Sequence, residues 1–346
     1  MAGSPVVLVL DSVMSGFPSN SSFRQVEITV SVARVDTGDV GSFVFLVDAV
    51  SDRLCIDIAS ALRSMLFDIA YDYGWMERET VVYPSLTFKV ECREKYMVDG
   101  NILFGETNTF MTGSRAVPGR VSEIDRLRLT SSIADSYGSL RFTTKPKSDT
   151  ELVLLGEYVA TYSIGAEGGV VGASRQMNTD GLHVLSDGRK VYVVPDDGTI
   201  FPLRFVNSMG VLDTATAICK EALSYNIQTE SYSVAKYPDN LIPPGMDALK
   251  SGGRGKLSLS SGFVSRQWAD WWAEEVMRAT KCWIRYGSRY VKNGDELSEA
   301  PMWVPCIITP KDDEVVVYDR RSQSVCYVEF EAEICNEGSL LRGLLD

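Results

Sequence analysis

Residues 23–34 read FRQVEITVSVAR, and their pattern decides the class of fold. Apolar and polar side chains alternate along this stretch, the apolar ones being Val26, Ile28, Val30 and Val32. Such a period of two predicts a strand with one buried face. The segment GSFVFLV at 41–47 predicts the neighbouring strand, because the intervening VDTGDVG supplies the Asp and Gly residues of a tight turn. The two stretches therefore indicate a β-hairpin.

The period changes after this hairpin. Apolar residues recur at helical spacing between residues 56 and 73, namely Ile58, Leu62, Met65, Leu66 and Ile69. This spacing predicts an amphipathic helix over 56–73 that stops at Gly74. The stretch SLTFKVECREKYMV at 85–98 alternates again and predicts a strand. From about 100 to 145, turn residues mix with isolated apolar ones, and we expect an irregular arm.

A polar segment near residue 145 predicts a domain boundary, with one β-rich domain over 1–145 and a second over 146–346. The second half contains short β-prone runs separated by Asp-Gly turns. A stretch rich in Pro and Gly at 238–256 predicts a long surface loop. Residues 265–280 predict the second principal helix, with Ser265 as its N-cap. We therefore expect a mainly β fold of the α+β type, with two β-barrel or β-sandwich domains that each pack one amphipathic helix.

Composition and charge exclude several classes of protein. The 346 residues are 45% hydrophobic, which suits a chain with real cores and excludes wholesale disorder. Lys and Arg number 34 against 46 Asp and Glu, and the net charge of −12 opposes general binding of nucleic acid or anionic lipid. The opening MAGSPVVLVLDSVMSG has a short apolar run without preceding basic residues, so we expect neither a signal peptide nor a membrane span. Synthesis in a cytosol follows.

The residues that usually carry catalysis or bind metal are sparse. The seven cysteines form no CxxC pair, and His183 is the single histidine, so disulfide frameworks, zinc ribbons and most histidine-based active sites are not indicated. The glycine-rich stretches at 165–172 and 251–258 depart from the known phosphate-binding motifs. Asp196 and Asp197 precede a Gly and are typical of a hairpin turn. We expect no catalytic residue, no metal site, no cofactor and no enzymatic activity.

Acidic pairs and aromatic groups offer two further readings. The row Glu329, Glu331 and Glu333 could supply paired carboxylates for glycoside hydrolysis, but it also fits the polar face of a strand. Trp268, Trp271 and Trp272 lie on one broad helical face, which suits a packed core or a subunit contact, and they could instead stack on sugars. These three residues are candidate interaction residues, together with Arg254 in the predicted loop.

The segment RFVNSMGVLDTAT at 204–216 is the most distinctive string in the chain. Asn207 ends a predicted strand, and Gly210 lies in the turn that follows, so both are candidate interaction residues within a structured corner. The segment resembles a group of tail structural proteins of tailed phages and prophages from gut bacteria, in which a strand followed by F-[VI]-N-x-x-G and an acidic-Thr pair opens the C-terminal half. Those proteins also end in a strand like SVCYVEFEAEI at 324–334.

This resemblance, over about 150–340, implies a virion protein of the tail tube, distal tail or baseplate hub that is assembled in the host bacterial cytoplasm. Its expected partners are further copies of the same chain in a ring and other tail proteins. The alternative is a carbohydrate-binding or receptor-binding β-sandwich protein of the virion, which would use exposed Trp75 and Trp303. A host glycan would then be the partner, for which the sequence gives no direct support.

Overall fold

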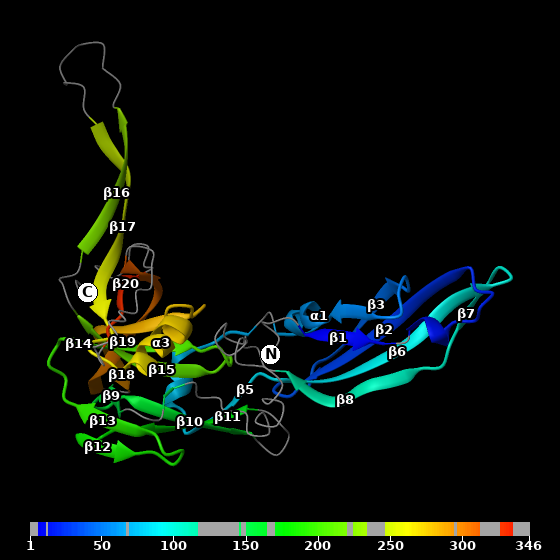
Figure 1. Cartoon of the computed structure of the whole chain (residues 1–346). Helices are drawn as coiled ribbons and strands as arrows, with labels where there is room; N and C mark the ends of the chain where they lie inside the picture. The colour runs from blue at the N-terminus through cyan, green and yellow to red at the C-terminus, as the bar shows by residue number, and fades with distance from the viewer. Residues whose placement is uncertain are drawn as a thin grey trace, which may run out of the picture. The chain divides into compact units, whose positions relative to one another are not determined.

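The structure is a computed structural model that describes residues 6–11, 13–66, 69–116, 145–146, 150–164, 170–219, 224–233, 246–293, 296–311 and 326–334 (Figure 1). Strands dominate these residues, and the helical segments are short, so the predicted mainly β fold is confirmed. In this described part of the chain, no helix has both the length and the hydropathy of a transmembrane span.

The chain divides into two compact units. Unit 1 comprises residues 1–144, 158–176 and 206–213, and unit 2 comprises the remainder. The sequence predicted a single domain boundary near residue 145. The observed division differs, because two later segments, 158–176 and 206–213, belong to unit 1. The first of them forms β10 (Tyr158–Ile164) and β11 (Val170–Gln176), and β11 pairs with β5 (Thr80–Tyr83) of the N-terminal region.

Unit 1 is built on a large antiparallel sheet. Strands β2 (Phe23–Arg34) and β3 (Val40–Asp48) form the predicted hairpin, and β2 also pairs with β6 (Leu86–Val98). The apolar residues of β2 are buried, as their alternation predicts, and Ile28 lies between Phe45 and Cys92 in the register. A short pair, β1 (Val7–Leu10) and β4 (Leu54–Asp57), contributes further side chains to the same core.

The helix predicted over 56–73 is shorter in the structure. Helix α1 spans Ala59–Ser64, and a 3₁₀ turn, η2, follows at Tyr73–Glu77. The start is fixed because Asp57 ends β4 and its carboxylate accepts a hydrogen bond from the Ala59 amide at 2.9 Å. Near the other end, the Tyr71 hydroxyl donates to the Gly210 carbonyl, a contact between distant parts of the sequence. Periodicity alone does not reveal such a contact.

The segment predicted to be an irregular arm, about 100–145, contains regular strands in its described first part. These are β7 (Asn101–Phe104) and β8 (Asn108–Ala116), and both pair with β6. The prediction of an irregular arm is wrong for β7 and β8. Their sequences do not alternate between apolar and polar residues, because most of their side chains are exposed on both faces and the strands are held by backbone pairing with β6. Residues 117–144 lie outside the described residues.

Unit 2 contains a closed barrel. Its strands are β14 (Ile200–Val206), β15 (Leu212–Cys219), β17 (Met246–Ser260), β18 (Cys282–Asn293), β19 (Glu296–Pro310) and β20 (Glu329–Ile334). They pair in the order β15-β14-β18-β19-β20-β17, and β17 returns to β15, which completes the ring of pairings. Strand β16 (Ser224–Ser233) pairs with β17 outside this ring. Another sheet has the order β12-β13-β9, from Gly181–Val184, Lys190–Val194 and Thr150–Leu154.

Strand β17 replaces most of the loop predicted at 238–256. Its glycine-rich part pairs with β16, and its residues from Gly255 onward pair with β20. The Gly residues suggested a loop, but they do not prevent a strand whose backbone is paired by neighbours. Residues 238–245 lie outside the described residues.

The helix predicted over 265–280 is present in shortened form. Helix α3 spans Arg266–Trp271 and continues as a π-helical turn, η4, over Trp272–Val276. The Ser265 hydroxyl accepts a hydrogen bond from the Trp268 amide, which confirms the predicted N-cap. The apolar face of this helix packs into the barrel core, together with Phe205, Ile284 and Phe330.

Candidate protein-interaction surfaces

One end of the unit 1 sheet carries an exposed ribbon. We define this distal ribbon as β7 together with Asn108–Met111 of β8. Strand β7 pairs with the last residues of β6, and the two are joined by Asp99 and Gly100. Both joining residues have positive φ, 50° and 80°, as a two-residue hairpin turn of type I′ requires. The turn therefore fixes the register of β7 on β6.

The distal ribbon is apolar on both faces. The exposed fractions are 54% for Ile102, 44% for Leu103, 47% for Phe104, 52% for Phe110 and 37% for Met111. Successive strand residues point to opposite faces, so Ile102 and Phe104 cover one face and Leu103 the other. A sheet that faces water normally has one polar face. Exposed large apolar side chains that lie close together in the chain make the ribbon a candidate site of protein contact.

Charged groups surround the distal ribbon. The Arg93 guanidinium lies 4.3 Å from the centre of the Phe104 ring and pairs with the Glu27 carboxylate. Asp99 and Glu106 are exposed in the turns before and after β7. Glu94 lies beside Gly105, whose amide donates to the Glu94 carbonyl at 2.8 Å. The turns of the ribbon therefore carry acidic side chains, while Lys95 of β6 lies opposite Phe104 in the register.

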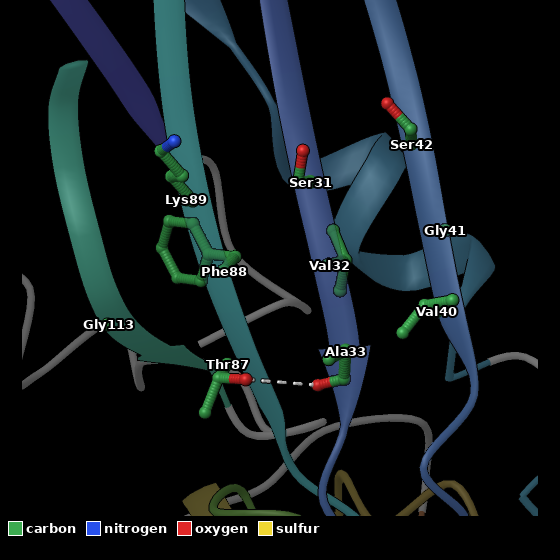
Figure 2. A pocket seen from close by; sticks show the side chains of 10 residues that line it. All are labelled: Ser31, Val32, Ala33, Val40, Gly41, Ser42, Thr87, Phe88, Lys89 and Gly113. Carbon is green, nitrogen blue, oxygen red and sulfur yellow. Dashed lines mark hydrogen bonds between the residues drawn. The ribbon is translucent and has the colours of Figure 1, made fainter.

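A hollow of about 630 Å³ lies on the same sheet, over β2, β3, β6 and β8 (Figure 2). Small side chains create it, because they leave space on the sheet face; they are Ser31, Ala33, Gly41, Ser42, Thr87 and Gly113. Val40 forms part of the lining and is 80% exposed. Lys89 is the one charged residue among the described residues that line the hollow, and its ammonium pairs with Glu91 at 2.6 Å.

Strand β3 borders this hollow and forms an edge of the sheet. Among the described strands, it pairs with β2 alone. Its residues 40–47 contain no charged side chain, and Val44 and Leu46 are 58% and 50% exposed. Edge strands normally carry charges or prolines that discourage pairing with another chain, and β3 lacks these over most of its length. We call the hollow together with β3 the edge groove.

The tryptophans singled out in the sequence do not lie on a surface. Trp268, Trp271 and Trp272 are 7%, 4% and 3% exposed, and they pack edge to face with one another. Trp272 also contacts the Phe330 ring, with centroids 5.4 Å apart. Of the readings offered by the sequence, the packed core is the one that the structure shows, and these faces are not open to a sugar ring.

Asn207 and Gly210 form a buried corner. The Asn207 side-chain oxygen accepts hydrogen bonds from the Met209 and Val211 amides at 2.9 and 3.3 Å, and its amide group donates to Asp213 at 3.3 Å. Gly210 has a φ of 76°, which explains the glycine, and its carbonyl accepts from the Tyr71 hydroxyl at 2.9 Å. Burial raises the pKa of Tyr71, so the hydroxyl remains a donor at neutral pH. Within the segment 204–216, on which the resemblance to tail proteins rests, Asn207 and Gly210 therefore stabilise the fold of this corner.

The remaining sequence candidates occupy structural positions. The Arg254 backbone lies opposite Asn226 in the β16–β17 ladder. His183 contacts the Thr179 carbonyl at 2.8 Å within one turn. The Asp196 and Asp197 carboxylates accept hydrogen bonds from the amides two residues later, as in a turn, but the turn is not the predicted hairpin, because β13 and β14 belong to different sheets. Among the described residues, His, Cys, Asp and Glu side chains form no group that could hold a metal ion.

Trp303 lies inside unit 2, beneath an ion-pair network. Its ring is 7% exposed and lies 3.9 Å from the Arg204 guanidinium. Glu157 joins this network, because its carboxylate pairs with Arg204 at 3.0 Å and with Arg285 at 3.1 Å. The exposed Trp303 that a glycan-binding platform needs is therefore absent from the structure. Trp75 is half-buried and contacts the Tyr71 and Tyr83 rings.

Reasoning from the sequence missed the distal ribbon and the edge groove. A signal for the ribbon exists, since NILF at 101–104 has three consecutive apolar residues between turn residues. The groove depends on which small residues face one another across strands, and no single stretch of sequence carries that information. Comparisons of the chain with protein-family models, with curated proteins and with solved structures gave no match.

Proposed function

We propose that this chain is a non-enzymatic structural subunit that assembles with further copies of itself and with other proteins. The observation that carries the proposal is the distal ribbon, which is apolar on both faces. Burying a large apolar side chain is worth about 1.5–3 kcal/mol, so the half-exposed Ile102, Leu103 and Phe104 each retain about 1 kcal/mol to be gained in an interface. A surface of this kind favours association over solvation.

The setting that we propose is the tail of a tailed bacteriophage or a related injection apparatus, assembled in the bacterial cytoplasm. This part of the proposal rests on the resemblance of residues 204–216 to tail structural proteins. The closed barrel of unit 2 supports it, because strands paired all round make a rigid wall element and leave few edges unpaired. The edge of β3, which no other described strand pairs, would supply a surface for contact with neighbouring subunits.

The proposal is tested by native mass spectrometry of the purified full chain over a concentration series, with negative-stain microscopy of the same samples. We expect discrete oligomers whose population grows with concentration, seen as closed rings or short tubes. A chain that stays monomeric at the highest soluble concentration would contradict self-assembly. Mixed complexes with other tail proteins would then be the remaining form of the proposal, and their absence on co-expression would refute it.

A further inference from the structure

We propose that Cys282 and Cys306 form a redox pair, which closes to a disulfide between β18 and β19 when the protein meets an oxidant and thereby stabilises the barrel. The two residues lie directly opposite each other in the antiparallel ladder of these strands. Both thiols are free in the structure and buried in the core of unit 2. The inference concerns this core alone, so it does not depend on the proposed assembly.

The backbone register brings the two cysteines within reach of a disulfide. Directly opposite residues of an antiparallel pair have Cα atoms about 4.5–5.5 Å apart. Disulfides span Cα separations of about 4.4–6.8 Å, so the bond needs no large movement of the strands. The side chains also meet, because the Cys282 thiol has Cys306 as a hydrogen-bond partner. Burial raises the pKa of Cys282, and this neighbouring thiol raises it further.

The surroundings of the pair are apolar. Phe205 of β14 lies opposite Cys282, and Ile334 of β20 lies opposite Cys306, so the four residues form one buried row across neighbouring strands. A disulfide carries no charge, so it suits this row as well as two thiols do. Cys326 belongs to the same core but lies in a separate bridge, opposite Val264. Among the described cysteines of this core, the register therefore pairs Cys282 with Cys306.

The reaction needs a two-electron oxidant, and a peroxide is small enough to reach thiols that larger reagents do not. One thiol takes up an oxygen atom of hydrogen peroxide and becomes a sulfenic acid, while the O–O bond breaks and water leaves. The second thiol then attacks this sulfur, so that the S–S bond forms, the S–O bond breaks and a second water leaves. The pair thus loses two electrons and two protons. A reducing compartment returns it to thiols, whereas an oxidising one keeps the bond.

Peptide mapping of the full chain tests the bond. The parent chain carries Cys55→Ser, because Cys55 is an exposed thiol, and Cys335→Ser, so that every remaining cysteine lies among the described residues. Hydrogen peroxide is added to the folded protein, and the remaining thiols are then alkylated in denaturant. Tryptic cleavage after Arg285 places the two cysteines of the pair in different peptides. We expect these peptides to be linked through Cys282 and Cys306 and to be separated by dithiothreitol.

Two single replacements in the parent chain provide matched controls. Cys326→Ala removes another buried thiol of the same core, and this variant should form the same link. Cys306→Ala should leave Cys282 without a link after the same treatment. Circular dichroism checks that each variant is folded. The proposal is refuted if both cysteines of the folded parent chain remain thiols, if they are oxidised separately without a link, or if Cys282 links to Cys326.

Thermal unfolding measures what the bond does to the barrel. The linked parent chain should have a Tm about 5–10 °C above that of the reduced chain, because the bond restricts the unfolded state between residues 282 and 306. Dithiothreitol should abolish this rise, and peroxide-treated Cys306→Ala should show none. A linked chain with an unchanged or lower Tm would show that the bond strains the barrel, and the stabilising role that we propose would be overturned.

Discussion

Replacing two apolar residues of the distal ribbon by threonine separates assembly from folding. The double variant Ile102→Thr, Leu103→Thr keeps β-branched side chains in β7, so the strand itself should persist. Both positions are about half exposed, at 54% and 44%, and they contribute little to the core of unit 1. Because about half of each side chain is already buried, we expect the free energy of unfolding to fall by up to about 1 kcal/mol per replacement, which leaves the chain folded.

The effect on assembly is measured separately from this loss of stability. Each side chain has about half of its surface left to bury, which is worth about 1 kcal/mol on the usual scale of 1.5–3 kcal/mol for a whole side chain. Losing two such contributions costs about 2 kcal/mol per interface. Because each 1.4 kcal/mol is a factor of ten, the dissociation constant should rise roughly 30-fold.

The assay is sedimentation velocity over a concentration series, with thermal unfolding measured on the same samples. The matched control is Leu182→Thr, Val184→Thr on β12, where the original residues are 60% and 63% exposed but lie in unit 2. Assembly of the ribbon variant at wild-type concentrations would refute the reasoning. An equal loss in the control would show that any reduction in surface apolarity has the same effect.

Three further predictions concern the fold. Asn207→Ala leaves two buried backbone amides without their hydrogen-bond acceptor. The free energy of unfolding, measured by denaturant titration, should fall by about 2–4 kcal/mol. An unchanged unfolding midpoint would contradict the role of this corner. Glu157→Gln weakens the buried ion-pair network around Arg204 and should lower the free energy of unfolding by about 3 kcal/mol. Thermal unfolding should then show a clear fall in Tm. An unchanged Tm would show that the network adds no stability. Cys55 is exposed and should react rapidly with iodoacetamide. Cys282 should react only after unfolding, because burial and the neighbouring thiol raise its pKa. Equal reaction rates of the two thiols in the folded protein would refute this.

Regular alternation made the main strands predictable. In β2, buried Val26, Ile28, Val30 and Val32 follow the pattern of the sequence, and β20 likewise buries Phe330, Ala332 and Ile334. The N-cap at Ser265 was also predictable, since capping depends on one side chain and the next turn of backbone. Local patterns decide these features because one face of each element is buried.

Features that depend on distant partners were not predictable. Strand β17 is rich in glycine and resembles a loop in sequence, yet it is held by β16 on one side and β20 on the other. The chain returns to unit 1 at 158–176 because β11 pairs with β5, a choice that no local signal encodes. The edge groove arises where Ser31, Ser42 and Thr87 face one side of three neighbouring strands. Each of these depends on register between segments far apart in sequence.

Hydrogen–deuterium exchange of the full chain at low and high concentration tests most directly whether the distal ribbon is an assembly surface. Exchange is followed on peptides that cover residues 101–111, with peptides from β12 as the internal reference. The account predicts that amides of β7 become protected as concentration rises while those of β12 do not change. Oligomers that form without any added protection of residues 101–111 would contradict it.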